Sequence, residues 1–206
     1  MHTYSTPQEE FWVGEFGNDY IKRNIDDAVV TSNLVLFGNI LKRAPNINSI
    51  LELGCNVGLN LEALKKIDGR FSLTGFEIND DAVRIASERN IAKIIHGTIV
   101  ERLEVNQVFD LTFTKTVLIH INPERLVNVY DNLYRLSKRY IMVCEYYNPS
   151  PVAVSYRGYA NQLFKRDFAG ELIDLYGLRL VDYGFAYRRD NYLRFQDDVT
   201  WFLLEK

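Results

Sequence analysis

One acidic residue and two glycines have the spacing of a ligand-binding loop. An apolar run starts at Ser49 and is closed by Glu52, and Gly54 and Gly58 follow it. A buried parallel strand is continuously apolar, and the tight turn after it needs residues without a bulky Cβ. Such glycines would let a ligand approach the backbone, and open α/β sheets bind nucleotide-like molecules at the carboxyl ends of their strands. The stretch therefore predicts a strand, a loop and a helix around a nucleotide-like cofactor.

The spacing of the glycines selects between cofactor classes. The dinucleotide fingerprint G-x-G-x-x-G, started at Gly54, requires glycine where the chain has Asn56 and Leu59. The phosphate-binding string G-x-x-x-x-G-K-[ST] does not occur. The pattern E-x-G-x-x-x-G resembles motif I of the S-adenosylmethionine-dependent methyltransferases, E/D-x-G-x-G-x-G, with Asn56 in place of the middle glycine. Asparagine tolerates a left-handed backbone better than most residues, so the turn can survive this change.

A second carboxylate supports a nucleoside site. Glu77 ends the next predicted strand, 25 residues after Glu52. A carboxylate at this position can accept hydrogen bonds from both ribose hydroxyls, and Ile78 would then pack on the adenine. The alternative is that Glu77 only ends a strand in solvent and that the glycines only make a turn. The order of acid, loop, helix, strand and acid favours the cofactor site.

The resemblance implies further cofactor-binding residues. In the resembling enzymes an acid often lies near the position of Thr98 and receives the adenine amino group, whereas threonine carries no charge. The aromatic segment at residues 8–24 would lie over the cofactor, with Trp12, Phe16 and Tyr20 closing the pocket and Arg23 near the methionyl carboxylate. The same aromatics could instead hold an amphipathic cap on the sheet, and both interpretations stay open. The expected cofactor-binding residues are Trp12, Arg23, Glu52, Gly54, Cys55, Asn56, Gly58, Glu77, Ile78, Thr98, Lys115 and Val117.

Alternating strands and helices must position these residues. The order of elements, with the resemblance, predicts an α/β, Rossmann-like methyltransferase fold, in which a seven-stranded, mostly parallel sheet ends in an antiparallel C-terminal hairpin. We expect one methyltransferase domain over residues 1–206, with residues 1–45 as an N-terminal helical cap over the cofactor site. Strands are predicted from residue 49 and at 71–77, 93–98, 108–114, 140–145, 179–186 and 199–205, and helices at 26–43, 59–67, 81–89 and 167–176 and from 122–123 onward.

Composition and charge narrow the class of protein. With 206 residues the chain can bury the core of one α/β domain. A net charge of −3 argues against a broad nucleic-acid surface, and no apolar run approaches the ~20 residues that cross a bilayer. We therefore expect a cytoplasmic protein without membrane or nucleic-acid partners. Cys55 and Cys144 are predicted to lie on strands too far apart for a disulfide, and the scattered histidines predict no structural metal.

Several longer blocks narrow the resemblance. The leader FWVGEFGNDYIKRN, the core LELGCNVGLNL, and VLIHINPERL, YYNPSPVAVSYRG, LFKRDFAGELID and DDVTWFLLEK follow one another along nearly the whole chain. In this order they resemble the pseudaminic acid biosynthesis-associated methylases. The resemblance implies methyl transfer from S-adenosylmethionine to a small acceptor, an acidic or nucleotide-linked sugar of bacterial nonulosonate biosynthesis.

Candidates for a catalytic base come from the loops after the fourth and fifth strands. His120 has the side chain whose ordinary pKa lies nearest neutrality, and Glu145 could also deprotonate an acceptor. The alternatives are a hydrogen-bonded core histidine between two isoleucines and a carboxylate that only ends a strand. Aromatic and cationic side chains suited to a charged sugar give the predicted substrate-binding residues Tyr20, Tyr146, Tyr147, Asn148, Tyr156, Arg157 and Lys165.

Two other functions compete with the sugar methyltransferase. One is methylation of another small metabolite or of a macromolecule. The other is a non-catalytic scaffold that keeps the cofactor pocket within a biosynthetic assembly. A homodimer is left open by the sequence.

Overall fold

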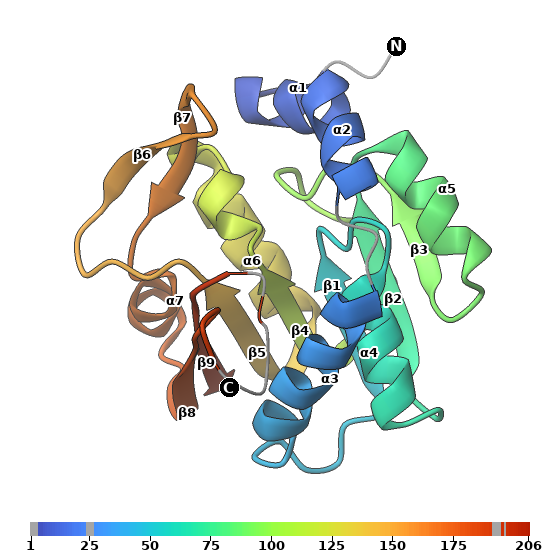
Figure 1. Cartoon of the computed structure of the whole chain (residues 1–206). Coiled ribbons are helices and arrows are strands. Elements are labelled where there is room, and N and C mark those ends of the chain that lie inside the picture. The colour runs from blue at the N-terminus through green and yellow to red at the C-terminus, as the bar shows by residue number, and fades with distance from the viewer. Residues whose placement is uncertain (1–3, 24–26, 191–194, 196) are drawn as a thin grey trace.

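A seven-stranded sheet runs through the centre of the described chain (Figure 1). The structure is a computed structural model that describes residues 4–23, 27–190, 195 and 197–206. The strand order is β3-β2-β1-β4-β5-β9-β8, with parallel pairing from β3 to β5 and antiparallel pairing of β9 with both β5 and β8. The strands are β1 (Ser49–Leu53), β2 (Ser72–Glu77), β3 (Lys93–His96), β4 (Phe109–Lys115), β5 (Ser137–Glu145), β8 (Arg179–Ala186) and β9 (Val199–Glu205). The predicted fold class is confirmed.

The order of the strands explains where a ligand can bind. From β1 the chain proceeds outward to β2 and β3, and it then returns to the other side of β1 with β4 and β5. The connections therefore diverge between β1 and β4, and a crevice forms at such a switch point outside the carboxyl ends of the strands. Both the glycine loop and the loop after β4 start at this point.

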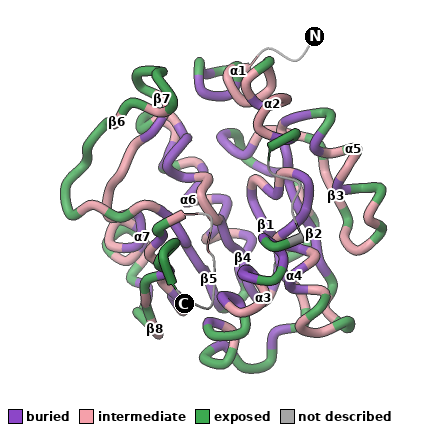
Figure 2. Tube along the Cα trace, in the orientation of Figure 1, coloured by how far each residue is buried: buried purple, intermediate pink, exposed green. Residues whose placement is uncertain are grey.

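Helices cover both faces of the sheet because neighbouring residues of a strand point in opposite directions. Ile50 packs in one apolar cluster with Phe37 and Leu61, whereas Leu51 packs in another with Leu133 and Leu172. The first face carries α3 (Asp27–Leu41), α4 (Leu59–Ile67) and α5 (Asp80–Glu88), and the second carries α6 (Leu126–Leu136) and α7 (Phe168–Tyr176). Figure 2 shows the central strands as buried and much of β8 and of the segment β6 (Val152–Tyr156) as exposed.

Most predicted element boundaries agree with the structure. The predicted ranges of α4, β8 and β9 match to the residue. Helix α5 starts one residue earlier than predicted because Asn79 is its N-cap, accepting hydrogen bonds from the amides of Asp81 and Ala82 at 3.0 and 3.1 Å. The prediction that α3 reaches residue 43 is wrong, since the helix ends at Leu41, and its predicted start at residue 26 lies outside the described residues.

Four elements, two strands and two 3-10 helices, were not predicted from the sequence. After β5 the chain forms a hairpin of β6 (Val152–Tyr156) and β7 (Tyr159–Lys165). Arg157 and Gly158, with φ of 49° and 90°, form its two-residue turn, the left-handed type that suits the twist of a hairpin. The short 3-10 helix η1 (Leu118–His120) lies in the loop after β4. The predicted helix from residue 122 starts as the 3-10 turn η2 (Pro123–Arg125) before α6.

The N-terminal segment folds into two short helices, α1 (Pro7–Val13) and α2 (Glu15–Arg23). Figure 1 shows them at the top of the molecule, between the β6–β7 hairpin and α5. Their position agrees with a cap, while the division of the chain into a domain and a cap stays a prediction.

Cys55 and Cys144 are buried free thiols, as expected. In the described part of the chain no helix has both the length and the apolar character needed to cross a membrane.

Candidate active site

A cavity of about 1100 Å³ of empty space, part of it open to solvent, lies at the carboxyl ends of the parallel strands. Its floor comes from the loops after β1, β2, β3 and β4, and its cover from α1, α2 and α3. Nine of the expected cofactor-binding residues line it, and Arg23, Glu52 and Gly58 are not among the lining residues. The nine are Trp12, Gly54, Cys55, Asn56, Glu77, Ile78, Thr98, Lys115 and Val117.

The glycine loop has the backbone that its sequence predicts. Gly54 and Gly58 have φ of 81° and 82°, and Asn56 has φ of 47°. A Cβ at position 54 would lie 2.7 Å from a methyl carbon of Val117, so no larger residue fits there without movement. Gly58 is the N-cap of α4 and therefore shapes the loop without lining the cavity. Asparagine thus replaces the middle glycine of the motif in the left-handed conformation expected of it.

Glu77 is buried at the tip of β2 and holds the loops around it. Its Oε1 accepts hydrogen bonds from the amides of Ile78 and Asn79, both at 2.9 Å, and its Oε2 accepts one from the amide of Asn56 at 2.8 Å. Burial raises the pKa of Glu77, and these hydrogen bonds oppose that rise. A carboxylate oxygen can accept about two hydrogen bonds, so Oε2 retains capacity for a ligand hydroxyl.

Glu52 lies behind the cavity wall and has an unsatisfied oxygen. It is fully buried, and its Oε1 accepts a hydrogen bond from Asn60 at 2.6 Å, while Asn33 donates to Asn60 at 2.8 Å. Its Oε2 has no hydrogen-bond partner among the described residues. Burial raises the pKa of Glu52 to about 8, opposed by the Asn60 hydrogen bond and by the charge of Lys115.

His120 lines the cavity with a defined tautomer. Its Nδ1 lies 2.6 Å from the carbonyl oxygen of Gln162. Because a carbonyl can only accept, Nδ1 carries the hydrogen and the lone pair of the neutral ring lies on Nε2. Burial lowers the pKa of His120 to about 4, which keeps the ring neutral at pH 7. The ring packs against Trp12 and Tyr156 at centroid distances of 4.8 and 4.7 Å.

Glu145 supports the loop that carries His120. It is buried at the end of β5 and does not line the cavity. Its carboxylate accepts hydrogen bonds from the amides of Val117, Leu118 and Ile119 at 3.2, 3.2 and 3.5 Å. Burial raises the pKa of Glu145 to about 7, against these hydrogen bonds. This geometry makes Glu145 a positioning residue, and its proposed role as a base remains a prediction.

The predicted substrate-binding residues fall into three groups. Tyr20 lines the cavity, and Tyr156 contacts His120 beside it. Lys165 lies 5.4 Å above the ring of Tyr146, and Arg157 lies 5.9 Å from that of Tyr156. Tyr147 and Asn148 contact the ring of Phe202 and the backbone of Arg166. Of the seven predicted residues, Tyr20 alone is among those that line the cavity.

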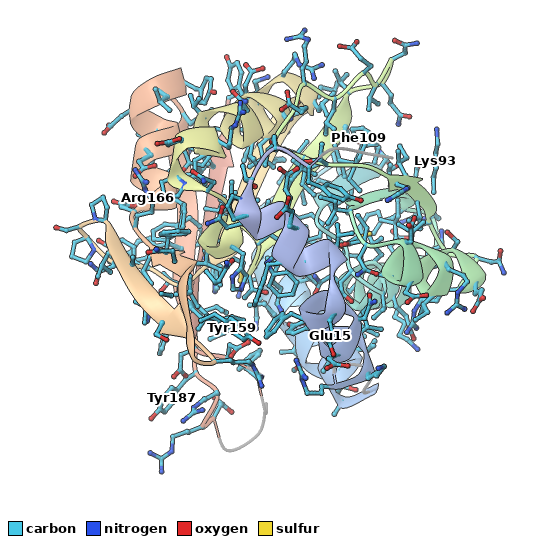
Figure 3. All side chains as sticks on the ribbon, turned by 90° about the horizontal axis from the view of Figure 1, so that it is seen from above. Glu15, Lys93, Phe109, Tyr159, Arg166 and Tyr187 are labelled. Carbon is cyan, nitrogen blue, oxygen red and sulfur yellow. The ribbon has the colours of Figure 1, made fainter. Side chains whose placement is uncertain are left out.

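Aromatic rings join the N-terminal helices to the β6–β7 hairpin. Phe11 stacks on Phe16 at 4.0 Å, and the edges of both rings meet Tyr159 at 5.1 and 5.7 Å. Phe16 also contacts Tyr156 at 5.7 Å. Figure 3 shows Tyr159 beside the N-terminal helices when the molecule is viewed from above. The N-terminal helices that cover the cavity are therefore held by a segment that is far away in the sequence.

Several lining residues were missed by the sequence analysis. Glu9 lines the cavity from α1 and bonds to Thr98. The pattern Thr6-x-x-Glu9 is a capping box that could have located the start of α1, since Thr6 Oγ1 accepts from the Glu9 amide at 3.2 Å. The contact of Glu9 with Thr98 is not encoded in any local pattern. The remaining missed polar residues that line the cavity are Thr6, Gln8, Asn33, Asn60, Thr116 and Asn122.

Comparisons with known proteins agree with this geometry. Residues 50–139 match the family model described as a methyltransferase domain. A comparison with curated proteins gives no match.

Solved structures share the fold at low sequence identity. An S-adenosylmethionine-dependent methyltransferase from Leishmania major is 14% identical, with a TM-score of 0.72 over 96% of this chain and 81% of that one. The magnesium protoporphyrin IX methyltransferase of Synechocystis PCC 6803, with bound S-adenosylhomocysteine, is 14% identical, with a TM-score of 0.68 over 96% and 97%. The plantazolicin methyltransferase BpumL, in complex with S-adenosylhomocysteine, is 16% identical, with a TM-score of 0.67 over 97% and 93%.

The domain match and the fold together define the class. The chain carries a methyltransferase domain in the Rossmann-like fold of the S-adenosylmethionine-dependent methyltransferases. The domain match indicates a methyltransferase, and two of the similar structures hold S-adenosylhomocysteine, the product form of the cofactor S-adenosylmethionine. The finer resemblance to the pseudaminic acid-associated methylases is not confirmed by these comparisons.

The residues present fit this cofactor. A nucleoside requires an acceptor for its hydroxyls, which Glu77 Oε2 provides. The amino-acid part of the cofactor carries an ammonium and a carboxylate. Lys115 lines the cavity as a cation, and Asn60, held by the buried Glu52 behind it, lines the cavity as a polar group. Complementary groups for both ends therefore exist at the same edge of the sheet.

Proposed function

We propose that this methyltransferase acts on a small anionic acceptor, an acidic or nucleotide-linked sugar of the nonulosonate (pseudaminic acid) type. The observation that supports the anionic acceptor is a pair of arginines beside the aromatic rings of the N-terminal helices and the β6–β7 hairpin, which we call the aromatic cover. Arg23 lies 5.7 Å from the ring of Phe16, and Arg157 lies 5.9 Å from that of Tyr156. The charges of both arginines oppose the burial that raises the pKa of Tyr20, so both lie near this cavity-lining residue.

The sugar is supported by the sequence resemblance and by the polar and aromatic character of the site. Flat aromatic faces with a few polar groups suit a ring that carries hydroxyls. Trp12 Nε1 is a buried donor with no hydrogen-bond partner in the described chain, and it could donate a hydrogen bond to an oxygen of the sugar. Arg157 and Lys165 would pair with the carboxylate or phosphate.

In this proposal the residues of the cavity hold and align the reactants. The bound cofactor supplies a methyl group on a sulfonium, ready for in-line displacement. The glycine loop and Glu77 fix the nucleoside, while Lys115 faces the amino-acid end and Glu52 supports that end from behind the wall through Asn60. Orientation of this kind can account for roughly 7–11 kcal/mol of barrier reduction in favourable intramolecular reactions. The aromatic cover excludes water.

His120 is the proposed contact to the acceptor hydroxyl. Its Nε2 lone pair can accept the hydroxyl hydrogen, because Nδ1 is committed to the carbonyl of Gln162. Glu145 keeps the preceding loop in place and thereby positions the imidazole. If the acceptor is a hydroxyl, His120→Asn lowers kcat, whereas intact turnover would make His120 structural.

The function is tested by incubating the protein with S-adenosylmethionine and a panel of acidic, nucleotide-linked and neutral sugars. We expect a mass gain of one methyl group on an anionic sugar. Arg157→Ala raises KM for that sugar by about tenfold or more, the loss expected for a charged hydrogen bond. Arg84→Ala, on the exposed face of α5, leaves KM unchanged. Cofactor binding without turnover of any acceptor would contradict the proposal and favour the scaffold.

A further inference from the structure

Glu9 brings a second carboxylate into the cavity from outside the matched methyltransferase domain. It is buried on α1 and lines the cavity, although residues 50–139 alone match the domain model. Its Oε1 accepts a hydrogen bond from the hydroxyl of Thr98, 89 positions further along the chain. Among the described residues that line the cavity, Glu9 and Glu77 are the acidic ones.

The two oxygens of Glu9 are used unequally. Oε2 accepts from the amide of Ser5 at 3.0 Å, from the hydroxyl of Ser5 at 2.8 Å and from the hydroxyl of Thr6 at 3.0 Å. Oε1 accepts only from Thr98 among the described residues. Because a carboxylate oxygen can accept about two hydrogen bonds, Oε2 is saturated and Oε1 retains one free position. The free capacity therefore lies on the oxygen next to Thr98.

The position of Thr98 assigns this oxygen to one end of the cavity. Thr98 follows β3, the strand that pairs with β2 on the side away from β1. The amide of Gly97 donates to the carbonyl of Glu77 at 2.9 Å, so the loop after β3 lies directly beside Glu77. Ile78 and Val100 add apolar surface there. A nucleoside with its ribose at Glu77 has its base between these apolar side chains, with its edge toward Glu9.

We propose that Glu9 Oε1 accepts a hydrogen bond from the exocyclic amino group of the cofactor's adenine and makes the site selective for a 6-aminopurine. The inference rests on the proposed placement of the ribose at Glu77. A carboxylate only accepts, so it suits an amino group and repels a carbonyl oxygen at the same position. Sites built to bond a donor discriminate strongly against an analogue that lacks it. Helix α1 thereby acts as a specificity element for the cofactor.

The experiment compares two ligands that differ at this edge of the base. Titration calorimetry on the full chain gives Kd for S-adenosylhomocysteine and for S-inosylhomocysteine, whose base has a carbonyl in place of the amino group. We expect the wild type to bind S-adenosylhomocysteine at least about tenfold more tightly. Glu9→Gln lowers this ratio by about tenfold or more, because the amide can donate to the carbonyl oxygen. Glu10→Gln, an exposed change on the same helix, leaves the ratio unchanged.

A second variant covers the case in which Glu9→Gln does not fold. Glu9→Asp keeps the charge but withdraws the carboxylate by one methylene, and it lowers the ratio severalfold. Glu77→Ala tests the ribose placement separately, because it weakens both ligands alike and leaves the ratio unchanged. A folded Glu9 variant with the wild-type ratio would overturn the inference and make Glu9 a structural cap. None of these measurements involves the acceptor, so they stand whether or not the sugar proposal fails.

Discussion

The carboxylate of Glu77 connects two loops through three hydrogen bonds, and these contacts determine the effect of removing it. It accepts from the amides of Asn56, Ile78 and Asn79, and its Oε2 retains acceptor capacity. We expect Glu77→Ala to weaken S-adenosylhomocysteine binding by about 1.5–3 kcal/mol, the range for hydrogen bonds to charged groups. Titration calorimetry measures the loss, and Glu88→Ala on the exposed end of α5 is the control. An unchanged Kd would show that the ribose lies elsewhere.

Glu52 predicts a pH dependence of stability. Burial raises its pKa from 4.5 to about 8 in the folded protein. Between these two values the folded state binds more protons than the unfolded state, so this group makes the free energy of unfolding fall as pH rises. Above pH 8 its contribution levels off. The destabilisation that comes from ionising the buried Glu52 is therefore absent below about pH 4.5 and fully present above about pH 8.

The variant Glu52→Gln isolates this contribution. Glutamine retains an acceptor for Asn60 and does not ionise, so its stability falls less steeply with pH than that of the wild type. Urea unfolding between pH 5 and pH 8 measures the difference between the two proteins, in which the titrations of Glu77 and Glu145 cancel to first order. Parallel stability curves would show that Glu52 is already ionised in the folded state.

At the scale of elements, the proposed function puts the β6–β7 hairpin on the acceptor side of the site. Gly158→Val places a branched side chain at a φ of 90°, although no atom would meet its Cβ within 4 Å. Backbone strain of about 1–2 kcal/mol is therefore the main effect. We expect a lower melting temperature and a higher acceptor KM, with the Kd of S-adenosylhomocysteine unchanged. The matched control is Gly69→Ala, which has equal space and no left-handed φ.

If Gly158→Val weakened cofactor binding as strongly as acceptor binding, the hairpin would serve the whole cavity rather than its acceptor side.

The hairpin also shows what local sequence patterns do not determine. The alternation of apolar and polar residues along 152–165 and the Arg157-Gly158 pair are typical of two strands joined by a turn. Prolines and polar aromatics before them are equally typical of a loop. What holds the hairpin in place is contact of Tyr156 and Tyr159 with Phe16, more than a hundred residues away.

At the scale of the whole molecule, the cofactor is expected to tie the N-terminal helices to the sheet. Saturation with S-adenosylhomocysteine at 100 times its Kd raises the free energy of unfolding by about 2.7 kcal/mol. If residues 1–45 cap the site, the amides of α1 gain protection from hydrogen exchange along with those of the glycine loop. Exchange measured by mass spectrometry gives both values, and the distant α7 serves as the reference. Protection of the loop without α1 would refute the cap.

The same scale explains how much the sequence could predict. The parallel core was predictable because each strand is a continuous apolar run followed by its own turn residues, as at Glu52 to Gly58. The position of Glu77 in the site was predictable for the same reason, since it depends only on where one strand ends. The contact of Glu9 with Thr98 and the hydrogen bond from His120 to the carbonyl of Gln162 form only when distant segments meet, so no local spacing predicts them.

The side chain that caps α5 also fastens the cover of the cavity. Asn79 Nδ2 donates to the carbonyl of Trp12 at 3.0 Å and to the side chain of Asn18 at 2.8 Å, while its Oδ1 faces the first amides of α5. A serine or an aspartate would begin that helix as well, but neither offers an amide hydrogen pair. The side-chain amide of Asn79 thus fixes the position of the N-terminal helices over the cavity. A serine or an aspartate in its place would keep the start of α5 but would release these two helices.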